Sequence, residues 1–188
     1  FLITRKDVID ELTKHRIVVT PKRSELEILS AFASASRIGR NWIRTIGNEK
    51  IPRSELNHLI EYANQGSRSI LLMDRPGSGK TCLLLDFVDY IENSTPWGLL
   101  FIKGDQFTDV NSESDFVARG LPDDLVGQCA RLATLRKVIV ILDSLDVLSL
   151  SRRHGALKVF LVLMDRLTAV EGLTLVVACR DFDLKYDP

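Results

Sequence analysis

The chain has 188 residues, and its 25 basic side chains balance 25 acidic ones, so the formal net charge is zero. Apolar residues make up 45% of the sequence and charged residues 27%, which is typical of a globular protein and excludes a disordered tail or a fibre. The zero net charge argues against a basic coat for nucleic acid as the main function.

The sequence has no apolar run that approaches the ~18 residues of a membrane helix, and its start has no signal-peptide pattern. We therefore expect a cytoplasmic protein that makes no membrane contact. The three cysteines are widely spaced and have no CxxC pattern, so we expect mostly buried thiols in a reducing compartment, not a disulfide or zinc set. These residues are Cys82, Cys129 and Cys179.

Residues 1–49 are predicted to form a small helical segment. Ser24 and Glu27 have the spacing of a capping box, which predicts a helix start near Ser24. A further helix is predicted from about Ser54, with four side chains facing inward: Leu56, Leu59, Ile60 and Tyr62. A group of residues between these helices could form a small nucleic-acid patch, but we favour a solvated face around one buried tryptophan. The group comprises Arg37, Arg40, Arg44, Lys50 and Trp42.

From Ser69 onward, short and wholly apolar runs alternate with longer amphipathic segments. The apolar runs are residues 70–73, 97–102, 138–142 and 173–179, and the amphipathic segments are residues 80–92, 122–134 and 155–170. Continuous β-branched runs separated by helices are typical of a parallel sheet that is covered on both faces. Since crossovers are right-handed, such a sheet is doubly wound. We therefore predict a doubly wound α/β fold with about four core strands over residues 50–188, preceded by the helical segment over residues 1–49.

The first apolar run leads into residues 74–81, which match the phosphate-binding loop pattern G-x-x-x-x-G-K-[ST] except that Asp74 replaces the first glycine. Glycines let successive backbone N–H groups point into one concavity, and the following helix adds the partial positive charge of its N-terminus. Lys80 is predicted to contact the β- and γ-phosphates, and Thr81 to hold Mg²⁺. The predicted nucleotide contacts in this loop are Pro76, Gly77, Ser78, Gly79, Lys80, Thr81 and Cys82. A glycine turn with a surface lysine is the alternative, which the strand–loop–helix order disfavours.

Two acidic residues follow the third apolar run. Asp143 stands at the tip of a buried strand, where a carboxylate is costly unless a cation meets it, so we predict that Asp143 is a Mg²⁺ ligand. A helix N-cap without metal is the alternative. Asp146 is the nearest remaining carboxylate and is predicted to act as a general base or to orient the attacking water. A capping or ion-pair role is the alternative for Asp146.

Residues 76–81, 138–146 and 175–180 together resemble the AAA+ and STAND classes of P-loop NTPase. Residues 143–146 are similar to the STAND form of the acidic strand end, called Walker B, and Cys179 with Arg180 is similar to the sensor-1 pair of that class. The resemblance implies that the fourth strand lies between the first and the third, and that Arg180 faces the γ-phosphate and acts in catalysis with Lys80 and Asp146. An ion pair of Arg180 with Asp181 or Asp183 is the alternative.

An upstream segment, Ile51, Pro52 and Arg53, resembles the short motif in these families whose backbone contacts adenine. A plain helix start is the alternative. The families continue beyond this point with a fifth strand and a helical lid, so we expect the chain to be the front part of a larger regulator that self-associates.

The resemblance implies ATP and Mg²⁺ as ligands and a slowly hydrolysing molecular switch, of the STAND type, in a signalling or defence protein. Two other functions stay open. One is an AAA+ motor that remodels protein or DNA, and the other is a nucleotide-binding module whose ATPase is vestigial.

Overall fold

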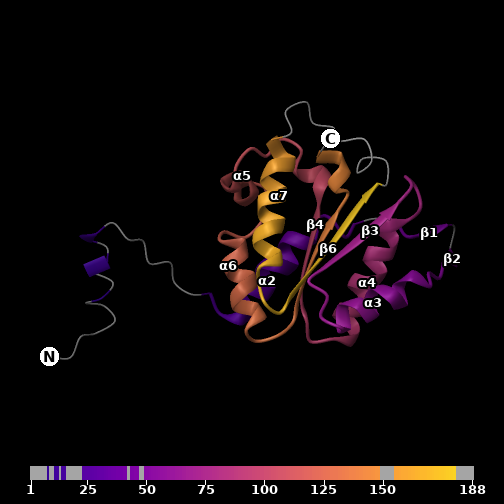
Figure 1. The fold of residues 1–188 in the computed structure, drawn as a ribbon, viewed down its shortest axis with the longest axis horizontal. Helices are drawn as coiled ribbons and strands as arrows, with labels where there is room; N and C mark the ends of the chain where they lie inside the picture. Colours follow the sequence, from indigo (N-terminus) through magenta and orange to yellow (C-terminus); the bar gives the residue numbers. More distant parts are fainter. Residues whose placement is uncertain are drawn as a thin grey trace.

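The computed structural model describes residues 8, 11–12, 14–15, 23–41, 43–46, 49–148 and 155–180. Within these ranges, one sheet contains four parallel strands: β3 (Ser69–Asp74), β4 (Gly98–Lys103), β5 (Val138–Asp143) and β6 (Leu173–Arg180). Their spatial order is β3-β6-β5-β4 (Figure 1). The fourth strand in the sequence thus lies between the first and the third, as the resemblance implies.

The strands form because their apolar residues are continuous, which suits a strand with both faces covered. All six residues of β5 are buried, and seven of the eight residues of β6 are buried as well. The outer strand β3 is more exposed, with Leu71 at 54% and Met73 at 49% of their full accessible area.

Helices cover both faces of the sheet, so the doubly wound α/β fold is confirmed (Figure 1). On one face, α3 (Glu55–Asn64) and α4 (Lys80–Ser94) pack on strand residues such as Phe101 and Ile141. On the other face, a second apolar cluster joins the strands to α2 (Glu25–Ser36), α5 (Glu113–Ala118), α6 (Leu125–Ala133) and α7 (Gly155–Thr168). Because all four strands are parallel, their carboxyl ends lie at the same edge of the sheet.

Helix α2 begins as predicted, because Ser24 and Glu27 form both hydrogen bonds of a capping box. Its Ile28 and Phe32 are buried in the apolar cluster of the α/β unit. At its end, the buried Ser36 hydroxyl accepts a hydrogen bond from the backbone N–H of Phe101 in β4 at 2.9 Å. Helix α2 is therefore part of the packed core, whereas the division of the chain at residue 49 stays a prediction.

The solvated face that we predict around Arg40 and Arg44 is wrong for these two residues. Both lie against α4, where Arg40 pairs with Glu92, and Arg44 pairs with Asp89 and with the buried Asp86. Trp42 lies outside the described residues, and so does the side chain of Lys50. The segment after α2 is thus tied to the helix that follows the glycine loop.

Some local expectations also differ from the structure. Tyr62 in α3 is 51% exposed, so its predicted inward orientation is wrong, whereas Leu59 is buried. Helix α5, the short 3₁₀ helices η1 (Gly104–Phe107) and η2 (Leu145–Leu148), and the small antiparallel pair of β1 (Thr45–Ile46) and β2 (Glu49–Lys50) were not anticipated. No helix within the described ranges has the length and apolar character needed to cross a membrane. All three cysteines lie in those ranges and form no disulfide.

Candidate functional site

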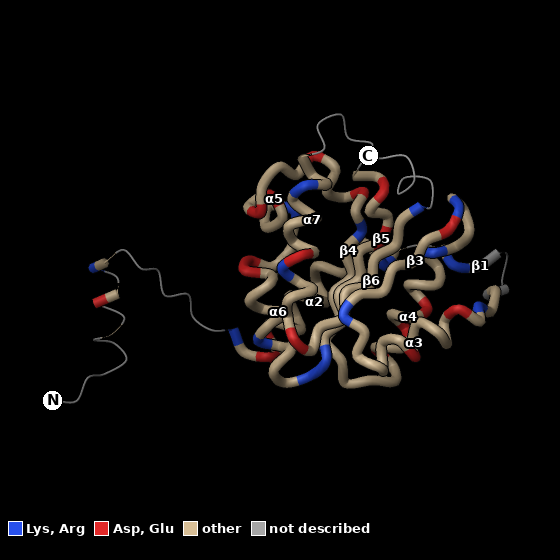
Figure 2. Tube along the Cα trace, viewed as in Figure 1, with Lys and Arg blue, Asp and Glu red and all other residues tan. Residues whose placement is uncertain are grey.

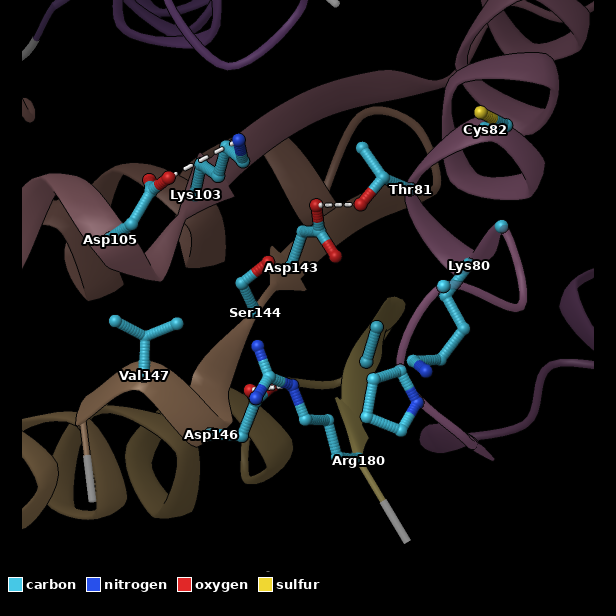
Figure 3. A pocket seen from close by; sticks show the side chains of 14 residues that line it. Lys80, Thr81, Cys82, Lys103, Asp105, Asp143, Ser144, Asp146, Val147 and Arg180 are labelled. Atoms are coloured by element: carbon cyan, nitrogen blue, oxygen red, sulfur yellow. Dashed lines mark hydrogen bonds and ion pairs between the residues drawn. The ribbon is translucent and has the colours of Figure 1, made fainter. Parts of the chain in front are cut away.

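A pocket of about 450 Å³ lies at the edge of the sheet where the four parallel strands end. This is the edge at which doubly wound sheets bind ligands. The glycine loop, the ends of β4, β5 and β6, and η2 all contribute lining residues (Figure 3). Figure 2 shows residues of both charges along this edge. The predicted residues that line the pocket are Pro76, Gly77, Gly79, Lys80, Thr81, Cys82, Asp143, Asp146 and Arg180.

The glycine loop connects β3 to α4, and two of its glycines have the positive φ that an L side chain rarely adopts. Gly77 has φ +77° and Gly79, at the N-terminus of α4, has φ +88°. Alternation of such residues with ordinary ones turns successive backbone N–H groups toward one side and creates an anion-binding concavity. The loop therefore has the backbone conformation that the sequence pattern predicts.

The Lys80 ammonium group lies over this loop. Its Nζ donates hydrogen bonds to the backbone carbonyl of Asp74 at 2.8 Å and to that of Arg75 at 2.9 Å. These are neutral acceptors, so the positive charge of Lys80 is not cancelled by them. The Asp74 carboxylate accepts a hydrogen bond from the backbone N–H of Arg75 at 2.7 Å, and this bond is the largest of the influences that lower the pKa of Asp74.

Thr81 and Asp143 meet inside the pocket. The Thr81 hydroxyl donates to Asp143 Oδ2 at 2.8 Å, which brings the first turn of α4 against the end of β5 (Figure 3). Asp143 is only 2% exposed, and this burial raises the pKa of its carboxyl above the usual value. The Thr81 hydrogen bond and the positive charge of Lys103 act in the opposite direction on that pKa. The two residues predicted to hold a metal are therefore brought together.

These two residues fit a magnesium ion that also binds nucleotide phosphates. Mg²⁺ prefers oxygen ligands and is commonly held by one or two carboxylates together with substrate phosphates and waters. A hydroxyl and a carboxylate oxygen in contact provide such a set. In the described part of the chain, no group of three or more His, Cys, Asp or Glu residues is placed to hold a metal on its own. A Mg²⁺ ion at Thr81 and Asp143 would leave coordination positions for phosphate and water oxygens.

Lys103 and Asp105 are site residues that sequence reasoning missed. Lys103 ends β4 beside Asp143, which ends β5, and it forms an ion pair with Asp105 of η1 at 3.2 Å (Figure 3). The Lys103 side chain is 11% exposed. The signal was available, because Lys103 directly follows a predicted strand of the parallel sheet and must therefore share the edge with Asp143.

Asp146 and Arg180, both predicted as catalytic, are bonded to each other. Arg180 Nε lies 2.8 Å from Asp146 Oδ2, and the Asp146 side chain is 4% exposed. The ion-pair alternative for Asp146 therefore describes the structure, with Arg180 as the partner. Asp181 and Asp183, the alternative partners of Arg180, lie outside the described residues.

The upstream motif reaches the loop through one residue only. Arg53 Nη1 donates to the backbone carbonyl of Ser78 at 3.1 Å, and its guanidinium lies so close to Gly79 that a Cβ there would meet Arg53 Nη2 at 2.1 Å. A side chain at position 79 would displace the Arg53 guanidinium, while the positive φ of Gly79 is what favours glycine there. Ile51 and Pro52 are exposed, and neither is among the residues that line the pocket.

The similarity of this chain to known proteins lies among solved structures. No family model matches the sequence, and no curated protein matches it. Among solved structures, the chain is similar to PCH-2 of C. elegans, with 19% identity and a TM-score of 0.37, over 87% of this chain and 39% of that one. It is also similar to a chain from a structure of katanin self-assembly, with 13% identity and a TM-score of 0.42, over 89% of this chain and 56% of that one.

This chain therefore spans less than two thirds of either matched chain. Since both TM-scores lie below 0.5, the α/β fold rests on the strand order and helix packing of the chain itself.

Proposed function

We propose that this chain binds ATP with Mg²⁺ at the glycine loop and serves as a slowly hydrolysing molecular switch of the STAND type. One observation carries the proposal, namely the 2.8 Å hydrogen bond between Thr81 at the start of α4 and Asp143 at the end of β5. This bond brings the end of the glycine loop, which is predicted to bind phosphate, against Asp143, the carboxylate predicted to bind Mg²⁺. Both residues line the same pocket.

Each group in this pocket has a task in binding. The loop N–H groups and the N-terminus of α4 receive the phosphates, and Lys80 adds a mobile positive charge. Thr81 and Asp143 hold the metal, which when bound neutralises part of the charge on the β- and γ-phosphates. The backbone of residues 51–53 is the proposed contact for adenine, and the Arg53 bond to the loop supports a location of this segment beside the nucleotide.

Slow hydrolysis is proposed because few of the described residues that line the pocket could activate water. The residue after Asp143 is Ser144, not a second acid, and Asp146 is engaged by Arg180. Phosphoryl transfer depends on positioning and on positive charge around the γ-phosphate, here from Lys80 and Arg180. A switch needs binding and slow turnover, which matches this set of residues. Location in a larger signalling or defence protein, and self-association of that protein, are part of the proposal.

Nucleotide titration calorimetry tests the binding site, with Mg²⁺ and with EDTA. The wild-type chain is expected to bind ATP more tightly with Mg²⁺, and Lys80→Ala is expected to weaken binding by about tenfold or more through loss of a charged phosphate contact. Lys158→Ala, which removes an exposed lysine from α7, is the matched control and should bind like wild type. Equal affinity of wild type and Lys80→Ala would contradict the site.

Phosphate release distinguishes the switch from the two other functions. Turnover on the order of 1 s⁻¹ or faster, a common value for enzymes, would favour a motor of the AAA+ type. Tight Mg·ATP binding without any turnover above a Lys80→Ala background would favour a binding module with a vestigial ATPase. The proposed switch requires binding with slow but measurable turnover that Lys80→Ala abolishes.

A further inference from the structure

An arginine from a segment upstream of the sheet contacts the glycine loop. Arg53 Nη1 donates a hydrogen bond to the backbone carbonyl of Ser78 at 3.1 Å, across 25 positions of the sequence. The guanidinium group also lies directly against Gly79, because its atoms fill the space that a Cβ at that position would take. The planar end of the Arg53 side chain therefore contacts the loop exactly where residues 78 and 79 are joined.

The helix that follows Arg53 holds this arginine in place. The backbone carbonyl of Arg53 accepts a hydrogen bond from the N–H of Leu56 at 3.2 Å, in the first turn of α3. Leu59 and Ala63 of α3 are buried in one apolar cluster with residues of α4 such as Leu84. Figure 1 shows the two helices side by side. The Arg53 side chain therefore extends toward the loop from a point that the core keeps in place relative to α4.

The bond from Arg53 sets the orientation of one peptide unit in the loop. The peptide bond between Ser78 and Gly79 is trans, and in a planar trans peptide the C=O and the N–H point in opposite directions. Gly79 lines the pocket, whereas Arg53 is not among the described residues that line it, so the Ser78 carbonyl is held on the outer side of the loop. The Gly79 N–H is therefore turned away from Arg53, toward the concavity that suits an anion.

We propose that Arg53 is a positioning residue for the glycine loop, and that its guanidinium group holds the 78–79 peptide so that the Gly79 N–H can donate to a bound phosphate. This inference rests on the proposed function and deepens it, because the task of the Arg53 side chain is separate from the adenine contact proposed for the backbone of residues 51–53. A donor that is already oriented costs less entropy when the ligand binds. The contribution of Arg53 should therefore depend on the phosphates and not on the base.

A comparison of nucleotides with a phosphate chain that has no base tests this inference in the intact chain. Calorimetry and competition give the dissociation constants of ATP, ADP and inorganic tripolyphosphate, each with Mg²⁺, for wild type and Arg53→Ala. We expect Arg53→Ala to bind all three about tenfold more weakly, as for loss of one hydrogen bond to a charged group. Because the effect acts through geometry, the ratio of variant to wild-type dissociation constants should not change between about 0.05 M and about 0.5 M salt.

The amide resonance of Gly79 reports on the peptide itself. In isotopically labelled protein, saturating tripolyphosphate should shift this resonance in wild type and should shift it less in Arg53→Ala. Arg68→Ala is the matched control for affinity and for the resonance, since Arg68 is exposed and precedes β3, at the sheet edge opposite the pocket. If circular dichroism shows that Arg53→Ala does not fold, Arg53→Lys replaces it. Lysine keeps the charge without the planar group, so a smaller loss that is equal for the three ligands is then expected.

Four results would overturn the inference. Unchanged affinities in the Arg53 variant would mean that the contact orients no phosphate donor. Weaker binding of ATP and ADP with unchanged binding of tripolyphosphate would assign Arg53 to the base. A loss that fades at high salt would make Arg53 a distant charge, and a wild-type shift of the Gly79 resonance despite weaker binding would leave this peptide unaffected by Arg53. If instead tripolyphosphate does not displace ATP from wild type, or neither binds, the proposed function itself fails and the inference fails with it.

Discussion

The hydroxyl of Thr81 donates a hydrogen bond to Asp143 Oδ2 at 2.8 Å, across a sequence separation of 62 residues. This bond ties the first turn of α4 to the tip of β5. The two oxygen-bearing side chains proposed as metal ligands are therefore preorganised by the sheet and by each other. Preorganisation of this kind lowers the cost of assembling a ligand set when the ligand binds.

Replacement of Thr81 by valine should therefore remove the magnesium dependence of ATP binding. Valine keeps the shape of threonine but has no hydroxyl, whereas Thr81→Ser keeps the hydroxyl and serves as the control. We expect Thr81→Val to bind ATP about tenfold more weakly than wild type with Mg²⁺, as for loss of one hydrogen bond to a charged group. With EDTA the two should bind alike. If Thr81→Val still gained affinity from Mg²⁺ as wild type does, Thr81 would not be a ligand.

Replacement of Asp143 by asparagine should stabilise the protein without ligands at neutral pH. Burial raises the pKa of Asp143 in the folded state, and the charged groups that face it are Lys103 and Asp105. A raised pKa means that stability is greatest below the ordinary value of 3.8 and is lost as the pH rises through the raised value. Asparagine has no such charge, so its advantage should appear at neutral pH and vanish in acid.

Thermal unfolding between pH 3 and 8, without nucleotide or metal, measures this difference. A gain on the order of 1 kcal/mol would raise the melting temperature by about 2–4 °C in a chain of this size. The same variant should lose Mg²⁺-dependent ATP binding, so stability and function move in opposite directions. A lower melting temperature for Asp143→Asn at pH 7 would contradict this prediction. It would show that the neighbouring groups stabilise the ionised carboxylate by more than burial destabilises it.

The sheet could be predicted because its signal is local and continuous. Each core strand is a run of apolar residues, and a run that ends in a charged residue marks the functional edge, as Asp143 does. The glycine loop was predictable for a similar reason, since Gly77 and Gly79 have a conformation that few other residues adopt. Patterns of this kind lie within a few adjacent positions.

Pairings between distant side chains have no such local signal. Arg44 and Asp86 are forty-two positions apart in the sequence, and no periodicity connects them. The Arg44 side chain nevertheless forms an ion pair with Asp86 of α4. Asp146 was predicted to act on water as the nearest remaining carboxylate, and its partner, Arg180, ends a different strand 34 positions later. Lys103 directly follows a predicted strand, so its place beside Asp143 at the edge of the sheet could have been predicted from the sequence.

Removal of the Ser36 hydroxyl should destabilise the chain and test whether α2 belongs to the core. Ser36 Oγ accepts from the Phe101 N–H at 2.9 Å and donates to the Phe32 carbonyl at 2.6 Å, and Ser36 is fully buried. In Ser36→Ala the buried Phe101 N–H loses this partner, which costs about 1–3 kcal/mol. Ser34→Ala, at an exposed position of the same helix, is the control. Equal unfolding free energies for the two variants in urea would mean that α2 does not support β4.

Arg44→Ala should destabilise the protein through the charge that it leaves behind on α4. Arg44 pairs with Asp89 and with Asp86, whose side chain is 8% exposed. Loss of one partner of a buried pair costs about 3–5 kcal/mol, and the 30% exposure of Arg44 reduces the expected loss to roughly 1–3 kcal/mol. Arg37→Ala, an exposed arginine near the end of α2, is the matched control for chemical denaturation. If Arg44→Ala lost no more unfolding free energy than the control, the ion pairs of Arg44 would make no measurable contribution to stability.

Replacement of Asp74 by asparagine should strengthen nucleotide binding. Asp74 stands where the loop pattern has glycine. Its carboxylate accepts a hydrogen bond from the backbone N–H of Arg75, and this bond lowers the pKa of Asp74, so the side chain stays charged at neutral pH. Its negative charge also acts on Lys80, the group proposed to contact the phosphates. Asparagine keeps the acceptor oxygen for Arg75 and removes the charge. The loop should therefore keep its conformation, while the repulsion between Asp74 and a polyphosphate disappears.

The expected gain is small and depends on salt. Charges that are exposed to water interact weakly, so the dissociation constant of Mg·ATP should fall by only about two- to fivefold in dilute buffer. Screening should reduce this gain at 0.5 M salt, because the Debye length is then only a few ångströms. Asp115→Asn is the control, since Asp115 likewise accepts backbone N–H bonds, from Asn111 and Ser112 beside α5, and its pKa is lowered in the same way. Weaker ATP binding by Asp74→Asn at every salt concentration would mean that the carboxylate supports the loop, and that its charge does not oppose the nucleotide.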